Sequence, residues 1–153
     1  MLFGSAYYAE YQPYERLVAD LDLMVEAGFT VIRVGESTWA SYEPRDGEIS
    51  FDALARVIDE AGKRGIKVIV GTPTYAIPAW MARQHPEIMG VGPNGVAAPY
   101  GARQNVDYSH PVFRAYAERI IRVMGERFGH HPAVIGWQVD NEIGIQNLAS
   151  ARQ

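Results

Sequence analysis

Cysteine is absent from the 153-residue chain. Its absence excludes disulfides, thiolate-bound metals and a cysteine nucleophile. No stretch approaches the roughly 20 apolar residues that span a bilayer, and the start, MLFGSAYYAEYQP, lacks the basic and long apolar regions of a signal peptide. These absences predict a cytoplasmic protein with no membrane partner.

Clustered positive charge is missing as well. Lys and Arg number 14 against 18 Asp and Glu, which gives a net charge of -4, and the basic residues are scattered singly. Because phosphate binding depends on clustered Lys and Arg, we expect no nucleic-acid partner. The 48% of hydrophobic and 21% of charged residues are typical of a globular protein, and the length suffices for one compact domain.

Strand-like and helix-like segments alternate along the chain. The first strand is predicted over 2–8, and short apolar runs that contain β-branched residues predict further strands over 29–34, 66–71 and 133–139. Apolar residues at helical spacing predict helices over 14–27, 51–64 and 111–128, with Ser50 capping the second and Pro111 opening the third. The predicted apolar faces are Leu17, Leu21, Met24 and Val25, then Phe51, Leu54, Ile58 and Ala61, then Phe113, Tyr116, Ile120 and Met124.

This alternation implies an α/β fold with parallel strands joined by right-handed crossovers. A doubly wound sheet and a (β/α)8 barrel both fit that description. A doubly wound sheet usually carries a Gly-rich phosphate loop after its first strand, whereas residues 7–13 read YYAEYQP. The loops after the strands are long and rich in aromatic, proline and carboxylate residues, above all residues 72–109. Such loops are typical of barrel enzymes, so we predict a barrel.

A complete barrel needs about 250 residues. Residues 1–153 offer four strands and three helices, so we expect the N-terminal half of a single (β/α)8 domain, either a fragment or a partner for a second half. Four open strands would leave unpaired edges, and no stable terminal element is predicted after Glu142. A reading frame that continues beyond Gln153 with four more strand-helix units would identify the chain as a fragment.

The segment WQVDNEIG, residues 137–144, places Asn141 and Glu142 directly after the fourth predicted strand, at the mouth of the barrel. A carboxyl group there can be partly desolvated, which favours a general acid. Glycoside hydrolysis needs such a proton donor because a sugar alkoxide is a poor leaving group, and an amide can bond the sugar 2-hydroxyl. A turn that closes a strand also favours this dipeptide.

Five segments give the chain a more specific resemblance. In order they are YYAEYQP, VIRVGESTWASYEPRDGEISF, TPTYAIPAWMARQHPEIM, GARQNVDYSHPVFRAYAERI and HHPAVIGWQVDNEIG. Through them the chain resembles glycoside hydrolase family 42, the β-galactosidases of a large clan of (β/α)8 retaining glycosidases, over essentially its whole length. The resemblance implies a retaining β-galactosidase that acts on terminal non-reducing β-D-galactosides and uses no cofactor.

The same resemblance implies roles for individual residues. Glu142 matches the general acid/base, Asn141 the neighbouring substrate-binding amide, and Arg103 the arginine that hydrogen-bonds galactose; without the resemblance, a lone arginine in a long loop usually faces solvent. The family's nucleophile is a second glutamate near the end of the seventh strand, outside this chain. We therefore expect the isolated chain to be inactive, and the full-length form to be a trimer.

Other candidates follow the second and third strands. Glu36 is open to two interpretations, a residue that orients the site through hydrogen bonds, or a residue without a site role that pairs with Arg33 or faces solvent in the loop. Glu43 lies in YEPRDGE, a turn pattern, and is predicted to be a turn residue without a site role. Trp137 is predicted to be core. Aromatic residues near strand ends are divided between sugar stacking and core packing, namely Tyr7, Tyr8, Trp39, Tyr75 and Trp80.

The four histidines predict no metal site, because zinc needs three or four convergent ligands. His130 and His131 are adjacent at the opposite end from the site, and His85 and His110 stand alone. Some members of the family that the chain resembles bind zinc through a cysteine cluster. Here Asp107 occupies one of those positions, so the resemblance implies no structural metal.

Two other functions stay open. Another glycosidase of the clan, such as a β-glucanase or β-mannanase, would share the Asn-Glu pair but not the five segments. A non-catalytic carbohydrate-binding or structural fragment would fit the incomplete barrel.

Overall fold

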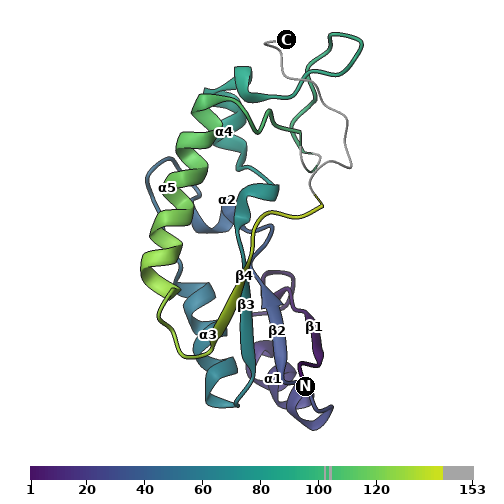
Figure 1. Cartoon of the computed structure of the whole chain (residues 1–153), viewed down its shortest axis with the longest axis vertical. Coiled ribbons are helices and arrows are strands. Elements are labelled where there is room, and N and C mark those ends of the chain that lie inside the picture. Colours follow the sequence, from purple (N-terminus) through teal and green to yellow (C-terminus); the bar gives the residue numbers. More distant parts are fainter. Residues whose placement is uncertain (102, 104, 143–153) are drawn as a thin grey trace.

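The computed structural model describes residues 1–101, 103 and 105–142, and the tail for which no terminal element was predicted lies outside them. The four strands form one parallel sheet: β1 (Gly4–Ala6), β2 (Val31–Val34), β3 (Lys67–Gly71) and β4 (Val134–Gln138) (Figure 1). They lie side by side in sequence order. A doubly wound sheet reverses its strand order at a switch point, whereas here every crossover steps in the same direction. The winding is therefore that of a barrel.

Three long helices follow the predicted pattern, namely α1 (Arg16–Glu26), α3 (Asp52–Lys63) and α5 (Pro111–Phe128). Short helices occupy the loops, namely α2 (Trp39–Tyr42), α4 (Ala79–Gln84) and the 3-10 turns Ala9–Tyr11, Pro73–Tyr75 and Pro86–Ile88. Helix α5 begins at Pro111 as predicted, because the first helical position needs no N–H donor. Ser50 only weakly supports the start of α3, since its Oγ accepts from the Asp52 amide at 3.4 Å.

The hydrophobic core lies between one face of the sheet and the three long helices. Along β2, Ile32 and Val34 are buried, while Val31 and Arg33 are partly exposed on the opposite face. The buried helix residues that pack against this face include Leu17, Leu21, Leu54, Ile58, Ala61, Ile120 and Met124. Most of the predicted apolar faces are thus confirmed. No helix in the described part of the chain is long and apolar enough to cross a membrane.

Two predicted core residues are exposed instead. Val25 is 45% exposed, because α1 turns Leu17 and Leu21 toward the core and leaves Val25, one helical turn after Leu21, outside it. Trp137 is 36% exposed although it pairs with the buried Val70 of β3. Strand β4 forms the edge of the described sheet, so Trp137 lacks the cover that β2 and β3 receive from the long helices.

The loop between β3 and α5 extends beyond the carboxyl ends of the strands (Figure 1). Antiparallel bridges join Met89 to Val106 and Val91 to Ala97 within it. This internal pairing folds the loop back on itself and places Arg103 on the same side as the ends of the strands.

Glu43 is fully buried and connects three segments, so the prediction of a plain turn residue was wrong. Its carboxylate accepts from the Trp39 indole N–H at 2.9 Å and from the Gly47 amide at 2.8 Å, and it pairs with Arg119 of α5. Its backbone carbonyl accepts from the Trp80 indole N–H at 2.7 Å. The residue lies in a turn, as predicted, but its side chain points inward and joins α2 to α5, while its backbone carbonyl holds α4.

Gly71, the last residue of β3, supplies a test of the fold. A Cβ atom at this position would lie 2.8 Å from both Cα and Cβ of Glu36. We expect Gly71→Ala to lower the free energy of unfolding by about 1–3 kcal/mol, because backbone must move to relieve the overlap. Thermal unfolding followed by circular dichroism measures the change.

Gly125→Ala in α5 is the matched control, since nothing lies within 4 Å of its added Cβ. We expect this change to raise the free energy of unfolding by roughly 0.5–1 kcal/mol, because alanine is the better helix former. Equal stability of the two variants would contradict the close approach of Glu36 to β3.

Candidate active site

Four polar side chains meet on the face of the sheet that the long helices do not cover. Arg33 is paired in register between Ala6 and Ile69, and it reaches across that face. Its guanidinium donates to Gln138 Oε1 at 2.6 Å and to the Tyr8 hydroxyl at 3.1 Å. We call Tyr8, Arg33, Glu36 and Gln138 the inner-face network.

Glu36 accepts bonds from every other member of the inner-face network. Its carboxylate lies 2.7 Å from the Arg33 guanidinium, 2.5 Å from the Tyr8 hydroxyl and 3.3 Å from Gln138 Nε2. The residue is 5% exposed, and a buried charge needs such partners. Of the alternatives left open for Glu36, the structure shows the ion pair with Arg33 and excludes a solvated loop residue. The hydrogen bond to Glu36, followed by desolvation, raises the pKa of Tyr8.

The inner-face network extends to residues 140–142, which include the predicted catalytic residue. Gln138 Nε2 also donates to the Asp140 carbonyl at 2.8 Å and to Asn141 Oδ1 at 3.1 Å. Asp140 and Glu142 have left-handed backbones, with φ of 56° and 51°. Asn141 is partly buried between them. The end of β4 is therefore a tight turn that two residues other than glycine hold in an unfavourable conformation.

Glu142 is exposed at the end of this turn. The partial desolvation that the sequence predicted is therefore not provided by the described residues. The cause is its position after β4, which is the edge strand of the described sheet.

Strand β3 supports the same turn from the other side. The Asp140 amide donates to Thr72 Oγ1 at 2.8 Å, and Thr74 Oγ1 donates to Asp140 Oδ2 at 2.8 Å. The three residues are between 2% and 5% exposed. Nearby, burial and the charge of Asp140 raise the pKa of Tyr108, whose buried hydroxyl has no hydrogen-bond partner among the described residues.

Arg103 is exposed, and its guanidinium lies 5.1 Å from the centre of the Tyr75 ring. It borders a small hollow of about 80 Å³, whose other walls include Tyr75, Tyr100 and Asn105. Tyr75 directly follows Thr74, which bonds to Asp140. The structure thus connects Arg103 to the Asp140 turn through residues 74 and 75.

Four of the five aromatic residues considered for sugar stacking are buried in the described structure, namely Tyr7, Trp39, Tyr75 and Trp80. Tyr8 is half-buried and bonds within the inner-face network. Four of these aromatic residues therefore pack in the interior beneath the site, and Tyr8 contributes a hydrogen bond to it.

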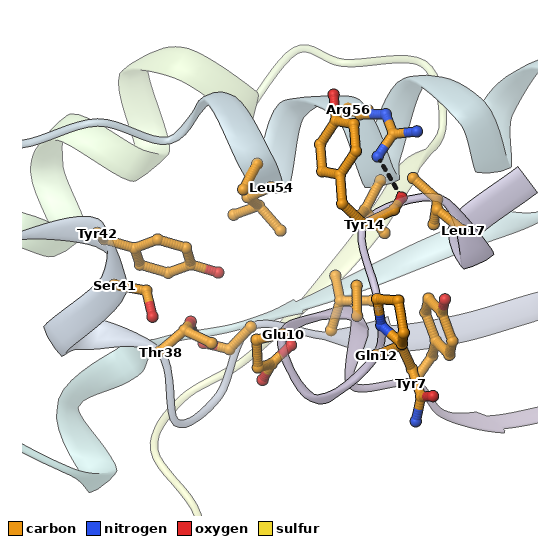
Figure 2. A pocket seen from close by; sticks show the side chains of 16 residues that line it. Tyr7, Glu10, Gln12, Tyr14, Leu17, Thr38, Ser41, Tyr42, Leu54 and Arg56 are labelled. Atoms are coloured by element: carbon orange, nitrogen blue, oxygen red, sulfur yellow. Dashed lines mark hydrogen bonds between the residues drawn. The ribbon is translucent and has the colours of Figure 1, made fainter.

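A larger cavity, of about 250 Å³, lies on the opposite face of β2. Figure 2 shows its lining, in which Leu17 and Leu54 approach from α1 and α3, and Arg56 bonds to the Tyr14 carbonyl. Val34 lines it, whereas Arg33 points the other way, so β2 separates it from the inner-face network. Glu10 borders this cavity, and burial raises its pKa.

No group of three or more His, Asp or Glu residues in the described part of the chain is arranged to hold a metal ion. The described histidine contacts are within the protein: His110 accepts from the Val112 amide at 3.3 Å, and His131 lies 3.1 Å from Asp59. Asp107 accepts from the Ser109 hydroxyl at 2.6 Å.

Sequence reasoning missed Gln138 and the two threonines. Gln138 had one available signal, because a polar residue in the otherwise apolar run AVIGWQV must find partners. Thr72 and Thr74 gave no comparable signal, since threonine is common at the ends of strands.

Sequence comparison relates the chain to known β-galactosidases. The sequence model of glycoside hydrolase family 42, described as β-galactosidase, matches residues 6–152. A β-galactosidase of Arthrobacter sp. is 42% identical over 142 residues, which is 93% of this chain and 20% of that protein. A β-galactosidase of Thermus thermophilus is 39% identical over 146 residues, or 95% of this chain and 23% of that protein.

Solved structures agree. The crystal structure of a β-galactosidase from the psychrophilic Marinomonas ef1 superposes with a TM-score of 0.91 at 37% identity, over 95% of this chain and 22% of that one. A cold-adapted β-galactosidase from Rahnella sp. R3 gives a TM-score of 0.92 at 36% identity, again over 95% and 22%. The described sheet therefore comprises the first four strands of a (β/α)8 barrel, and the chain spans about a fifth of the relatives' length. On this evidence the chain belongs to glycoside hydrolase family 42.

Proposed function

We propose that this chain is the N-terminal half of the catalytic barrel of a retaining β-galactosidase and that it supplies the general acid/base, Glu142. The observation that carries the proposal is the turn at the end of β4, where Gln138 fixes Asn141 beside the exposed Glu142. Membership of a family described as β-galactosidase supports the substrate, a terminal non-reducing β-D-galactoside.

Two residues are proposed to bind the galactose unit. The Asn141 amide accepts from Gln138 through Oδ1, which orients the side chain beside Glu142, and an amide of this kind can hydrogen-bond the sugar 2-hydroxyl. Arg103 presents several donors in a fixed planar geometry at the edge of a small hollow. Both arrangements suit a ligand with many hydroxyl groups.

The proposed reaction has two steps. Glu142 donates its proton to the glycosidic oxygen as the bond from that oxygen to the anomeric carbon breaks, while a carboxylate bonds to the anomeric carbon from the opposite side. Glu142 then takes a proton from water, whose oxygen replaces the carboxylate and releases galactose.

The attacking carboxylate is proposed to lie outside this chain. In a retaining mechanism the two carboxyl groups are about 5 Å apart across the anomeric carbon. Glu36 is engaged by Arg33, Tyr8 and Gln138, and Glu43 is buried with Arg119. Neither is free to attack, which supports a nucleophile contributed from outside this chain.

The remaining expectations about the whole protein stay predictions. They are a cytoplasmic location, a trimer of full-length chains and the lack of nucleic-acid and membrane partners. The alternative that the enzyme is a related β-glucanase or β-mannanase, or that the chain is a non-catalytic fragment, is open to direct assay.

Hydrolysis of nitrophenyl glycosides separates these alternatives. We expect no turnover from the isolated chain, because it lacks the nucleophile, and clear turnover of the β-galactoside by the full-length enzyme that joins this chain to the second half of the barrel. Turnover by the isolated chain would contradict the placement of the nucleophile. A full-length enzyme that prefers the β-glucoside or β-mannoside, or hydrolyses nothing, would favour an alternative.

Glu142→Gln tests the proton donor in the full-length enzyme. We expect kcat/KM for an alkyl galactoside to fall by about 10²–10⁴-fold, because the leaving alkoxide then lacks its proton. A dinitrophenyl galactoside, whose leaving group needs no proton, should be affected far less in the bond-breaking step. Glu48→Gln, at an exposed turn carboxylate, is the control that should leave both rates unchanged. A small, equal loss on both substrates would exclude the acid role.

Arg103→Ala tests the sugar contact. We expect kcat/KM for galactosides to fall roughly ten- to hundredfold, which corresponds to the loss of a hydrogen bond to a charged group. The constant for inhibition by free galactose should rise along with it. Arg83→Ala, which removes an exposed arginine from α4 in the same loop, is the control. An unchanged inhibition constant would show that Arg103 does not touch the sugar.

A further inference from the structure

Thr72, Thr74 and Asp140 form a closed ring of hydrogen bonds at the ends of β3 and β4. The Asp140 amide donates to Thr72 Oγ1 at 2.8 Å, the two threonine hydroxyls lie 3.2 Å apart, and Thr74 Oγ1 lies 2.8 Å from Asp140 Oδ2. All three side chains are buried. We call these residues the threonine ring.

The direction of each bond in the ring follows from the donors available. A carboxylate only accepts, so Thr74 has to give its proton to Asp140. Thr72 accepts from the Asp140 amide and is left to donate to Thr74. Each hydroxyl therefore donates one hydrogen bond and accepts one. If Thr74 donated to Thr72 instead, the buried Asp140 Oδ2 would lose its donor.

The backbone that this ring holds is otherwise unfavourable. Asp140 and Glu142 have φ of 56° and 51°, and a glutamate rarely adopts this conformation without support. The remaining polar atoms of Asp140 are also engaged, since its Oδ1 accepts from the Asn141 amide at 2.6 Å and its carbonyl accepts from Gln138 at 2.8 Å. Asp140 is thus fixed at all four polar atoms.

We infer that Thr72 and Thr74 are positioning residues for the proposed reaction, which act by holding the Asp140 turn so that Asn141 and Glu142 face the substrate together. The catalytic part of this inference rests on the proposed function. Neither threonine touches the sugar. Their effect comes through the direction in which the two residues after Asp140 leave the turn, and a small misplacement of a reacting group is costly.

Thr74→Val in the full-length enzyme removes the donor to Asp140 and keeps the shape of the side chain. We expect kcat/KM for an alkyl galactoside to fall roughly ten- to hundredfold, because Glu142 no longer meets the glycosidic oxygen in line. A dinitrophenyl galactoside should lose less than about threefold of its rate of bond breaking, since it needs no proton. Thr74→Ser keeps the hydroxyl and should restore the alkyl rate to within about threefold.

Thr38→Val is the matched control, because Thr38 is also buried and its hydroxyl donates to the Gly35 carbonyl at 2.8 Å, away from the Asp140 turn. It should change the rates on both substrates by the same factor. Thr72→Val removes the acceptor for the Asp140 amide and serves as a second test if Thr74→Val does not fold. It should likewise slow the alkyl galactoside more than the dinitrophenyl galactoside.

The outcomes separate the two proposals when Glu142→Gln is assayed alongside. If Glu142→Gln discriminates between the leaving groups and Thr74→Val and Thr72→Val do not, the threonine ring has only a structural role and the inference is overturned. An equal loss in Thr74→Ser and Thr74→Val would overturn it as well. If Glu142→Gln itself fails to discriminate, the proposed function fails first.

Discussion

The ion pair between Arg33 and Glu36 is the interaction on which the rest of the site depends. Arg33 places a positive charge on the face of the sheet that becomes the inside of the barrel, and such a charge is stable only when it is paired and hydrogen-bonded. The same two groups bond to Tyr8 after β1 and to Gln138 of β4. One pair therefore fixes the carboxyl ends of three strands relative to one another.

Two glycines make that ion pair possible. Gly35 has φ of 89°, and a Cβ there would lie 2.9 Å from the Tyr42 hydroxyl. Gly71 lies so close to Glu36 that it has no room for a side chain. The chain can therefore turn sharply after β2 and lay Glu36 across the end of β3, within reach of Arg33 three residues earlier. The backbone conformation is thus a condition for the electrostatics of the site.

The parts of the fold that depend on local pattern were predictable from the sequence. Helix α5 follows the apolar spacing from Phe113 to Met124 and begins at Pro111 as predicted. The burial of Glu43 was not predictable, because Arg119 lies 76 residues away and nothing local announces the contact. Gln138 and Arg33 are 105 residues apart. The candidate site residues could be named from family resemblance, but the network that holds them required the tertiary structure.

Position and solvent exclusion have separate origins in this molecule. The orientation of Asn141 is set by Gln138 and by the threonine ring, all of which lie within the first four β/α units. Glu142, Trp137 and Val139 lie on or just after β4, an edge strand of the described sheet, and the described residues leave all three exposed. Because the turn is already held in place by these bonds, it needs little rearrangement when further structure packs against it. The conformational cost of the two left-handed residues is thus met by bonds within the described units, whereas under the proposed function the low dielectric and the second carboxylate are supplied from outside them.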